Sequence, residues 1–400
     1  MRQGKGFSGT MSGRNLPTIV FINHWARHLG GAEHSLRDLL EYAAGRSRCH
    51  LVTSEPGELA RAAAAAGVTC HVVRCAMRQR NFLRERIAST IFFSIGDAAA
   101  FLGYVLRLRR LVRRLGPDLI HANVPKSHVA LFLLSLLGYR GQSCFHIREL
   151  FGKRSMPSVL YGLLFPMRNA AAIAISQAVQ ESLPPRVRTK STVVYNGVAI
   201  AKKPLAPARG NDPLRLLYLG RIVPWKGCHE LVDILAKLRT RFPGNAAALS
   251  LVGDSSYWSR EYRCSLEDKI KSSGLAQACS LLPATGDVRG ALFCHDVFVN
   301  GSHLEPFGRS IAEAQGAGLP VVSFDSGGVK EIVKHGETGF LVPYGNQEAF
   351  VDAVAEFVEH PDLVRTMGDR GFERAREYFN REIQVPKIWE SITGSAATPL

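Results

Sequence analysis

The segment Asp296–Val322, DVFVNGSHLEPFGRSIAEAQGAGLPVV, decides the fold of this 400-residue chain. It starts as a short apolar run, passes through a polar loop, and continues with the apolar spacing of a helix until a glycine and a proline end it. A proline after Glu305 suits the first position of that helix. The segment therefore predicts a helix at the carboxyl end of a strand, whose first backbone N–H groups form an anion site at Phe307, Gly308 and Arg309.

Similar apolar runs alternate with helical stretches along the whole chain, as in parallel sheets covered on both faces. In the first half, strands are expected at Thr18–Ile22, His50–Thr53, His71–Val73, Asp118–Ala122, Ser143–Ile147, Ala171–Ile175 and Thr192–Tyr195. In the second half, they are expected at Leu214–Leu219, Ala248–Val252, Ser280–Leu282, Val297–Val299, Val321–Ser323 and Phe340–Val342. Helices are expected at Glu33–Ala44, Leu102–Leu115, Cys228–Leu238, Ser265–Ser272, Phe307–Ala317 and Gln347–Glu359.

The two series are separated by a proline-containing stretch without periodicity, residues 199–212, which we interpret as a linker. We predict an α/β fold with two doubly wound, Rossmann-like domains, 16–198 and 213–377, after a disordered polar tail at 1–15. Sheets of this kind bind ligands at the carboxyl ends of their strands, so the two domains should face each other across a ligand cleft. Residues 374–392 predict one or two further helices, broken at Pro386.

Three local patterns point to an anionic ligand. Glu305 and Glu313 are eight residues apart, about 12 Å along a helix, so both can flank one ligand of nucleotide-sugar size. In LLYLGRIVPWKG a loop follows a strand and begins at Gly220. It carries two cations, the planar guanidinium of Arg221 and the ammonium group of Lys226, and such a pair suits a diphosphate. In GGAEHSLRDLL, Gly30 and Gly31 precede a helix and allow close approach of a phosphate. Each pattern also has a simpler interpretation: a helix cap with a solvated carboxylate, two solvated loop cations, and a turn.

Together these residues resemble the retaining glycosyltransferases of family 4, also called group 1, which have the GT-B architecture. The resemblance extends from Val20 to about Ile392 and includes E-P-F-G-x4-E, SGGVKEIV at 326–333 and ETGFLV at 337–342. It implies transfer of a hexose-type sugar, with retention, from a UDP- or GDP-sugar to a hydroxyl of a saccharide or lipid-linked acceptor in polysaccharide or glycoconjugate biosynthesis. It also implies that no metal or other cofactor takes part.

The resemblance implies roles for individual residues. Arg221 and Lys226 would bind the donor diphosphate, Glu313 the ribose, and Glu305 the transferred sugar together with the amides of the loop before the helix. Backbone near Gly253 would contact the base. The final helices, 378–400, would cross back to the first domain, which would bind the acceptor.

One part of the sequence departs from the family. Many relatives have H-x-H after the fourth strand, whereas this chain reads IHANVPKSH, with His121 and Asn123 at the two positions. We take both as catalytic candidates, with two alternatives: His121 as a buried histidine, and Asn123 as the acceptor contact. His146, Arg148 and Glu149, at the end of the next strand, are further acceptor-side candidates, or a plain surface ion pair.

Charge is distributed unevenly. Residues 1–200 hold 27 Lys/Arg and 10 Asp/Glu, a net +17, whereas residues 201–400 hold 23 and 24, a net −1. The basic half suggests an anionic partner, and the Arg-rich helical stretch Arg107–Arg114 suits an anionic membrane surface. No nucleic-acid-binding motif is present. With no signal-like or spanning segment, we expect a cytoplasmic protein, peripheral on the membrane face.

The sequence also bears on other function classes. A dehydrogenase needs G-x-G-x-x-G after an early strand, and the first strand here is followed by NHWARHLGGAEH. A GT-B sugar epimerase, or a non-catalytic membrane or nucleic-acid-binding module, remains an alternative.

Overall fold

The computed structural model describes residues 16–24, 29–75, 95–152, 161–162, 169–201, 212–243, 246–254 and 260–394. The chain divides into two compact units, residues 1–197 with 382–400, and residues 198–381. The tail expected at 1–15 and most of the linker expected at 199–212 lie outside the described residues.

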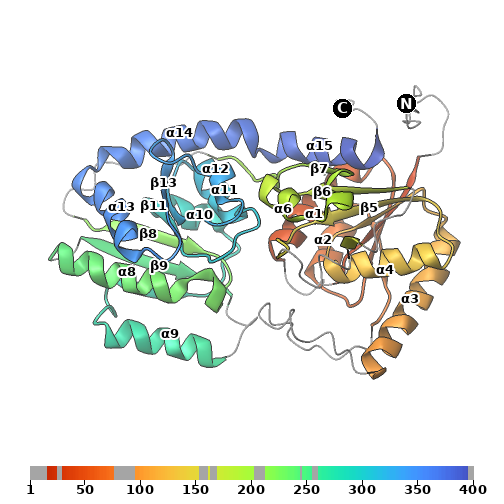
Figure 1. Ribbon diagram of the computed structural model, residues 1–400, viewed down its shortest axis with the longest axis horizontal. Coiled ribbons are helices and arrows are strands. Elements are labelled where there is room, and N and C mark those ends of the chain that lie inside the picture. The colour runs from red at the N-terminus through yellow and green to blue at the C-terminus, as the bar shows by residue number, and fades with distance from the viewer. Residues whose placement is uncertain are drawn as a thin grey trace. The chain divides into compact units, whose positions relative to one another are not determined.

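Unit 1 contains a seven-stranded parallel sheet with the order β3-β2-β1-β4-β5-β6-β7 (Figure 1). Its strands are β1 Thr18–Ile22, β2 Arg48–Thr53, β3 Thr69–Val72, β4 Leu119–Ala122, β5 Gln142–Ile147, β6 Ala170–Ala174 and β7 Ser191–Val193. β1 pairs with both β2 and β4. The strand order therefore reverses between β1 and β4, and the carboxyl ends of these strands are where this type of sheet binds ligands.

The helices of unit 1 cover this sheet. They are α1 Gly31–Ala43, α2 Glu58–Ala65, α3 Ile95–Leu115, α4 Pro125–Leu136, α6 Gln177–Ser182 and α7 Pro185–Arg188, with most of α15 Arg381–Thr393. The α15 residues Val385, Ile388, Trp389 and Ile392 pack in one buried cluster with Leu36 and other residues of β1, β2 and α1. The predicted return of the C-terminal helix to the first domain is confirmed.

Unit 2 contains a six-stranded parallel sheet with the order β10-β9-β8-β11-β12-β13. Its strands are β8 Leu214–Leu219, β9 Ala247–Val252, β10 Cys279–Leu282, β11 Val297–Asn300, β12 Val321–Phe324 and β13 Gly339–Val342. Its helices are the 3-10 turn η2 Pro224–Lys226, α8 Cys228–Arg241, α9 Arg260–Ser272, α10 Val288–Phe293, α11 Arg309–Gly316, α12 Val329–Ile332, α13 Gln347–Glu359 and α14 Asp362–Tyr378. The two doubly wound sheets confirm the predicted α/β fold.

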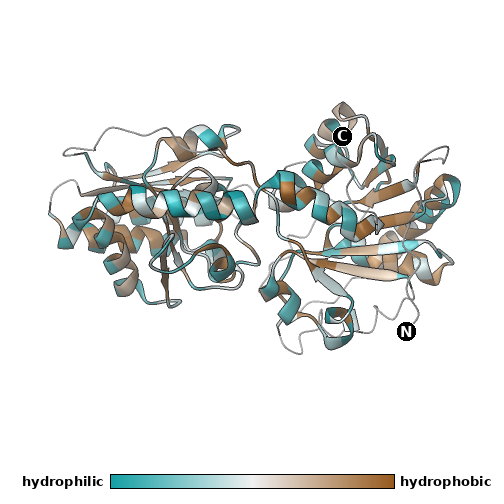
Figure 2. Cartoon of the chain, turned by 90° about the horizontal axis from the view of Figure 1, so that it is seen from above, coloured by the Kyte–Doolittle hydropathy of each residue, from teal (hydrophilic) through white to brown (hydrophobic). Residues whose placement is uncertain are grey.

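Hydropathy follows this layering. Figure 2 shows the strands mostly in brown, while the helices carry both colours. The central strands β1 and β11 are buried along their whole length, as continuous apolar runs require when both faces of a sheet are covered.

Several predicted helix boundaries are corrected: α3 and α9, for example, begin at Ile95 and Arg260 rather than at Leu102 and Ser265. Two further corrections have a clear cause in the backbone. The helix expected from Pro306 begins at Arg309, because Gly308 has a φ of 104° and its left-handed backbone cannot continue a helix. The break expected at Pro386 lies instead at Phe379–Asn380, and Pro386 is inside α15. There Val198 N donates to Phe379 O (2.8 Å) and Arg381 N donates to Val198 O (2.9 Å). A backbone pairing with a distant segment, rather than the proline, separates the two helices.

Candidate active site

The first part of the site is the loop between β8 and α8, at the carboxyl edge of the second sheet. Arg221 in this loop has an exposed side chain, and its carbonyl oxygen accepts a hydrogen bond from the Tyr218 hydroxyl (2.8 Å). Gly220 N donates to Val252 O (3.0 Å), which joins the start of the loop to the end of β9. The backbone beneath Arg221 is thus held, while its guanidinium faces solvent, as a binding fork requires.

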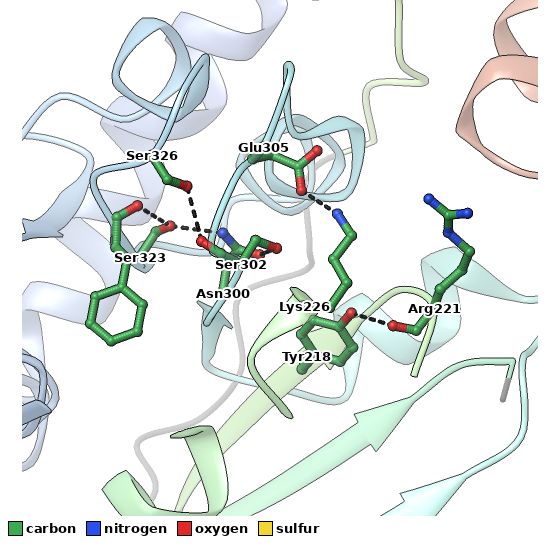
Figure 3. Close-up of polar contacts among 9 residues, drawn as sticks. Tyr218, Arg221, Lys226, Asn300, Ser302, Glu305, Ser323 and Ser326 are labelled. Atoms are coloured by element: carbon green, nitrogen blue, oxygen red, sulfur yellow. Dashed lines mark hydrogen bonds and ion pairs between the residues drawn. The ribbon is translucent and has the colours of Figure 1, made fainter. Parts of the chain in front are cut away.

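Lys226, at the other end of this loop, forms an ion pair with Glu305 from the loop after β11 (Figure 3). The side chains are 15% and 13% exposed. An ion pair this sheltered from water is stronger than a surface pair and holds both groups in one orientation. Figure 3 shows Arg221 and Lys226 extending in the same direction, with Glu305 facing Lys226. The structure therefore brings three predicted site residues to one edge of the sheet.

Glycines allow the loops to meet. Gly227 has a φ of 70°, and a Cβ atom there would lie 1.9 Å from Gly301 O. A Cβ atom at Gly253 would lie 1.7 Å from Gly220 O. Both are backbone contacts that a side chain would forbid. The close spacing of the three loops that follow β8, β9 and β11 depends on these positions.

The N-terminus of α11 faces the same edge. Gly308 is its N-cap and no side chain caps it within the part of the chain that the structure describes. Phe307 is buried with its ring 5.7 Å from that of Phe379, so it contributes backbone rather than side chain to the site. Arg309 Nε donates to Glu313 Oε1 (2.9 Å), one turn further along. Of the two predicted carboxylates, Glu305 is bound by a cation of another loop and Glu313 by one of its own helix.

A hydrogen-bonded group beneath the Glu305 loop was missed by the sequence analysis. Asn300 Nδ2 donates to Ser323 Oγ (2.9 Å), Ser302 Oγ donates to Asn300 Oδ1 (2.7 Å), and Ser326 Oγ donates to Ser302 O (3.0 Å), as Figure 3 shows. All four residues are buried. They tie the ends of β11 and β12 together below Glu305. The available signal was a small polar residue at the end of each of two successive apolar strands.

In unit 1, Gly30 and Gly31 lie where predicted, at the start of α1. Gly30 N donates to Glu33 Oε2 (3.1 Å), and Asn23 Nδ2 donates to Glu33 Oε1 (3.5 Å). The glycine turn is thereby tied to the residue that follows β1. Glu33, which the sequence analysis did not single out, holds it in place.

His121 lies inside the sheet of unit 1, fully buried. Arg148 is always a donor, so its contact with His146 Nδ1 (3.3 Å) makes that nitrogen an acceptor, and His121 Nε2 lies 3.2 Å from the same nitrogen. Burial lowers the pKa of His121 to about 3 and that of His146 well below its usual value, so both rings are neutral. The burial of His121 agrees with the alternative of a buried histidine bonded within the unit.

Asn123 is also fully buried and its amide is used within the unit. Its Nδ2 donates to Asn23 Oδ1 (2.9 Å) and its Oδ1 accepts from Arg148 Nε (2.9 Å). Arg148 NH1 donates to Asn196 Oδ1 (2.8 Å). Arg148 is half-buried, and it is the member of this group closest to solvent. Of the predicted acceptor-side candidates His121, Asn123 and Arg148, only Arg148 is partly exposed.

Two doubly wound parallel sheets, with a cationic loop and a glycine-capped helix at the edge of the second, define the GT-B class of glycosyltransferase fold. The family description "Glycosyl transferases group 1" matches residues 202–374, and "Glycosyltransferase Family 4" matches residues 29–202. The chain belongs to this family, the group 1 glycosyltransferases of family 4.

Curated relatives agree with this assignment. The chain is 33% identical over 167 residues to the lipopolysaccharide core biosynthesis glycosyltransferase LpsE of Rhizobium meliloti, which covers 42% of this chain and 46% of LpsE. It is 26% identical to the capsular polysaccharide biosynthesis glycosyltransferase CapM of Staphylococcus aureus, over 74% of this chain and 81% of CapM. The chain spans about half of the length of LpsE and of other curated relatives that it matches.

Solved structures show the same fold. HepE of Anabaena, in a crystal structure with UDP-glucose, superimposes with a TM-score of 0.77 at 23% identity, over 94% of this chain and 100% of that one. Sucrose-phosphate synthase of Thermosynechococcus elongatus superimposes with a TM-score of 0.74 at 22% identity, over 94% and 98%.

Proposed function

We propose that the protein is a retaining glycosyltransferase that moves a hexose-type sugar from a UDP- or GDP-sugar to a hydroxyl of a saccharide or lipid-linked acceptor. The observation that carries this proposal is the meeting of Arg221, Lys226 and Glu305 beside the open N-terminus of α11. Relatives named for lipopolysaccharide and capsule synthesis, and a structural neighbour solved with UDP-glucose, support the same chemistry.

The cations of the site suit a leaving diphosphate. In the proposed reaction the bond between the anomeric carbon and the diphosphate oxygen breaks, and Arg221 and Lys226 stabilise the negative charge that develops on that oxygen. In other enzymes a metal ion stabilises the negative charge of a leaving diphosphate. Here the cationic side chains and the helix amides are proposed to do so, and we propose a reaction without a metal or other cofactor.

The carboxylates have different proposed tasks. Glu305 binds hydroxyls of the transferred sugar together with the amides of Phe307 and Gly308, and Glu313 binds the ribose. Neither is placed as a nucleophile in the proposal, because each already has a cationic partner. The acceptor oxygen instead bonds to the anomeric carbon from the face that the diphosphate leaves, and its proton passes to the departing phosphate oxygen. The enzyme contributes position and electrostatics.

The acceptor side is assigned to unit 1. Arg148 and the Gly30–Gly31 turn lie at the carboxyl ends of its strands, on the edge where such sheets bind ligands. The surplus of basic residues in the first half of the chain supports a saccharide acceptor carried at an anionic membrane surface, with the protein peripheral on its cytoplasmic face. In the described part of the chain no helix is long and apolar enough to span a bilayer.

Nucleotide binding tests the donor site. Arg221→Ala and Lys226→Ala should each weaken UDP or GDP binding about 10- to 100-fold, because each removes a charge-assisted hydrogen bond of about 1.5–3 kcal/mol. Isothermal titration calorimetry measures this. Lys237→Ala is the matched control, because Lys237 pairs with Glu348 on the surface of the same unit. Unchanged affinity in both site variants would refute the diphosphate assignment.

The stereochemical part has its own measurement. NMR of the product formed from a donor of known anomeric configuration should show the same configuration, and mass spectrometry should find no glycosylated enzyme. An inverted product, or a trapped covalent adduct, contradicts the proposed same-face attack.

A further inference from the structure

Helix α3 presents a continuous basic and apolar face to solvent. Leu102 and Leu106 are 50% and 41% exposed, and Arg107, Arg110, Arg113 and Arg114 are exposed beyond them. At 100° per residue these six positions span about 140° of the helix circumference. The opposite side is buried in unit 1 through Tyr104, Val105, Leu108, Leu111 and Val112. The outer face is therefore a defined surface, which we call the α3 face.

The arginines of the α3 face form no ion pair with a carboxylate among the described residues. In the described part of the chain, no carboxylate lies within ion-pair distance of Arg110, Arg113 or Arg114. Arg107 donates to a backbone carbonyl, that of Arg74 (2.8 Å). By contrast, two surface cations of α8 in unit 2 pair with carboxylates, Lys237 with Glu348 and Arg241 with Asp352, both at 2.6 Å. Within the described residues, the positive charge of the α3 face is thus not offset by ion pairs.

The apolar part of this surface extends beyond α3. Arg109 Nε donates to Leu137 O (3.0 Å), which places the end of α4 against α3. At that end Leu136 is 67% exposed, and Arg140, four residues later, is also exposed. In Figure 1 the two helices lie together at one edge of unit 1. An exposed leucine and an exposed arginine at and just after the end of α4 therefore extend the surface formed by the leucines and arginines of α3.

We infer that the α3 face is the surface by which this protein docks on an anionic lipid bilayer. Uncompensated arginines fit the negative headgroups, and exposed leucines on the same face gain free energy only where an apolar phase lies within reach. A nucleic acid would bind the arginines but leave Leu102 and Leu106 in water. The two leucines therefore favour a bilayer over a nucleic acid as the partner. The inference rests on the proposed function for its purpose, delivery of the enzyme to a lipid-linked acceptor.

Vesicle sedimentation with the full chain tests this inference. The protein should sediment with vesicles of phosphatidylcholine containing about 30% phosphatidylserine and stay in solution with pure phosphatidylcholine. Binding should fall with salt, since the Debye length shortens from about 10 Å at 0.1 M to 3 Å at 1 M. The variant R110E/R113E/R114E should bind anionic vesicles about a hundredfold more weakly, because each basic residue near such a surface contributes about fivefold. R110K/R113K/R114K should keep binding.

Two further variants make the result specific. Leu102→Ser with Leu106→Ser should weaken binding about tenfold or more while leaving its salt dependence, because apolar insertion is lost and headgroup attraction is not. Lys237→Glu with Arg241→Glu reverses charges on α8 of unit 2 and should change vesicle binding little.

Four results would overturn the inference: no binding to anionic vesicles, equal binding by R110E/R113E/R114E, equal loss in the α8 control, or unchanged binding by the leucine variant. The last result, together with loss of binding to a fluorescent RNA in R110E/R113E/R114E, would identify a polyanion rather than a bilayer. Because vesicle binding needs neither donor nor turnover, its failure is distinguishable from failure of the proposed transferase activity.

Discussion

At the scale of single residues, the two carboxylates of the site differ in the origin of their ion-pair partners. Glu305 pairs with Lys226, which is 79 residues away, whereas Glu313 pairs with Arg309, which is four residues away on the same helix. Glu305 also accepts Gly328 N at its backbone oxygen (2.8 Å), so its loop is held from two sides. Glu305 therefore belongs to the junction of loops where the sugar is proposed to sit, and Glu313 to the helix beside the nucleotide.

This difference predicts a division between binding and turnover. Glu305→Gln should keep nucleotide affinity within about twofold and lower kcat about 100-fold or more, the usual cost of a lost transition-state contact. Glu313→Gln should weaken nucleotide binding about tenfold, because a neutral amide binds ribose hydroxyls less strongly than a carboxylate. Calorimetry with the nucleotide and steady-state kinetics with the donor measure the two effects. Glu348→Gln, on the surface of the same unit, serves as the control, and a reversed pattern would exchange the two roles.

At the scale of elements, the turn between η2 and α8 is set by one backbone contact. Gly227 combines a left-handed backbone with a position where a Cβ atom would overlap Gly301 O. The same contact brings Lys226 near the Glu305 loop, because Lys226 directly precedes Gly227 and Glu305 is four residues after Gly301. The ion pair and the glycine pair are thus consequences of a single close approach of two loops.

Substituting this glycine should be far more harmful than substituting one with the same backbone but no neighbour. Gly227→Ala should destabilise unit 2 by about 3 kcal/mol or more, because the loops must separate to remove the overlap. Gly274→Ala, at a φ of +68° with no heavy atom within 4 Å of the added carbon, should cost about 1 kcal/mol of left-handed strain. Urea denaturation followed by circular dichroism compares the two. Equal costs would show that the close approach is not needed for stability.

At the scale of the whole molecule, the two units differ in buried histidines. In unit 1, burial lowers the pKa of His24 and His128 to about 4 and that of His121 to about 3, and it lowers the pKa of His146 well below its usual value. In unit 2, burial lowers the pKa of the half-buried His229. A base whose folded pKa is depressed stays neutral in the folded state while the unfolded chain takes up a proton.

Acid should therefore unfold unit 1 before unit 2. Below about pH 6.5 the unfolded chain binds more protons than the folded one, so the free energy of unfolding decreases as the pH is lowered. Each such ring contributes a decrease of about 1.4 kcal/mol per pH unit until the pH reaches its folded pKa. Hydrogen exchange corrected for intrinsic rates, between pH 7 and 5, should show β4 and β5 losing protection while β8 and β11 keep theirs. Simultaneous loss in both units would mean that these histidines do not control acid stability.

Local sequence patterns predicted much of the strand and helix architecture. The strands Thr18–Ile22 and Leu214–Leu219 have the predicted bounds, because an apolar run between polar or glycine residues is a property of neighbouring residues alone. The same holds for the placement of Arg221, Lys226 and Glu305 after strands, since the carboxyl ends of parallel strands share one edge.

Other features were decided only by tertiary structure. That Lys226 pairs with Glu305, that His121 lies buried against His146, and that Asn300 binds Ser323 depend on which strands become neighbours, which periodicity along one chain does not specify. The break between α14 and α15 follows from the pairing of Val198 with the chain at Phe379–Arg381, and it overrides the proline that local rules would choose. Sequence by itself determined the elements and the chemistry at their ends. Strand order and long-range packing decided which of those groups meet, because contact energies between distant residues arise only once the sheets have formed.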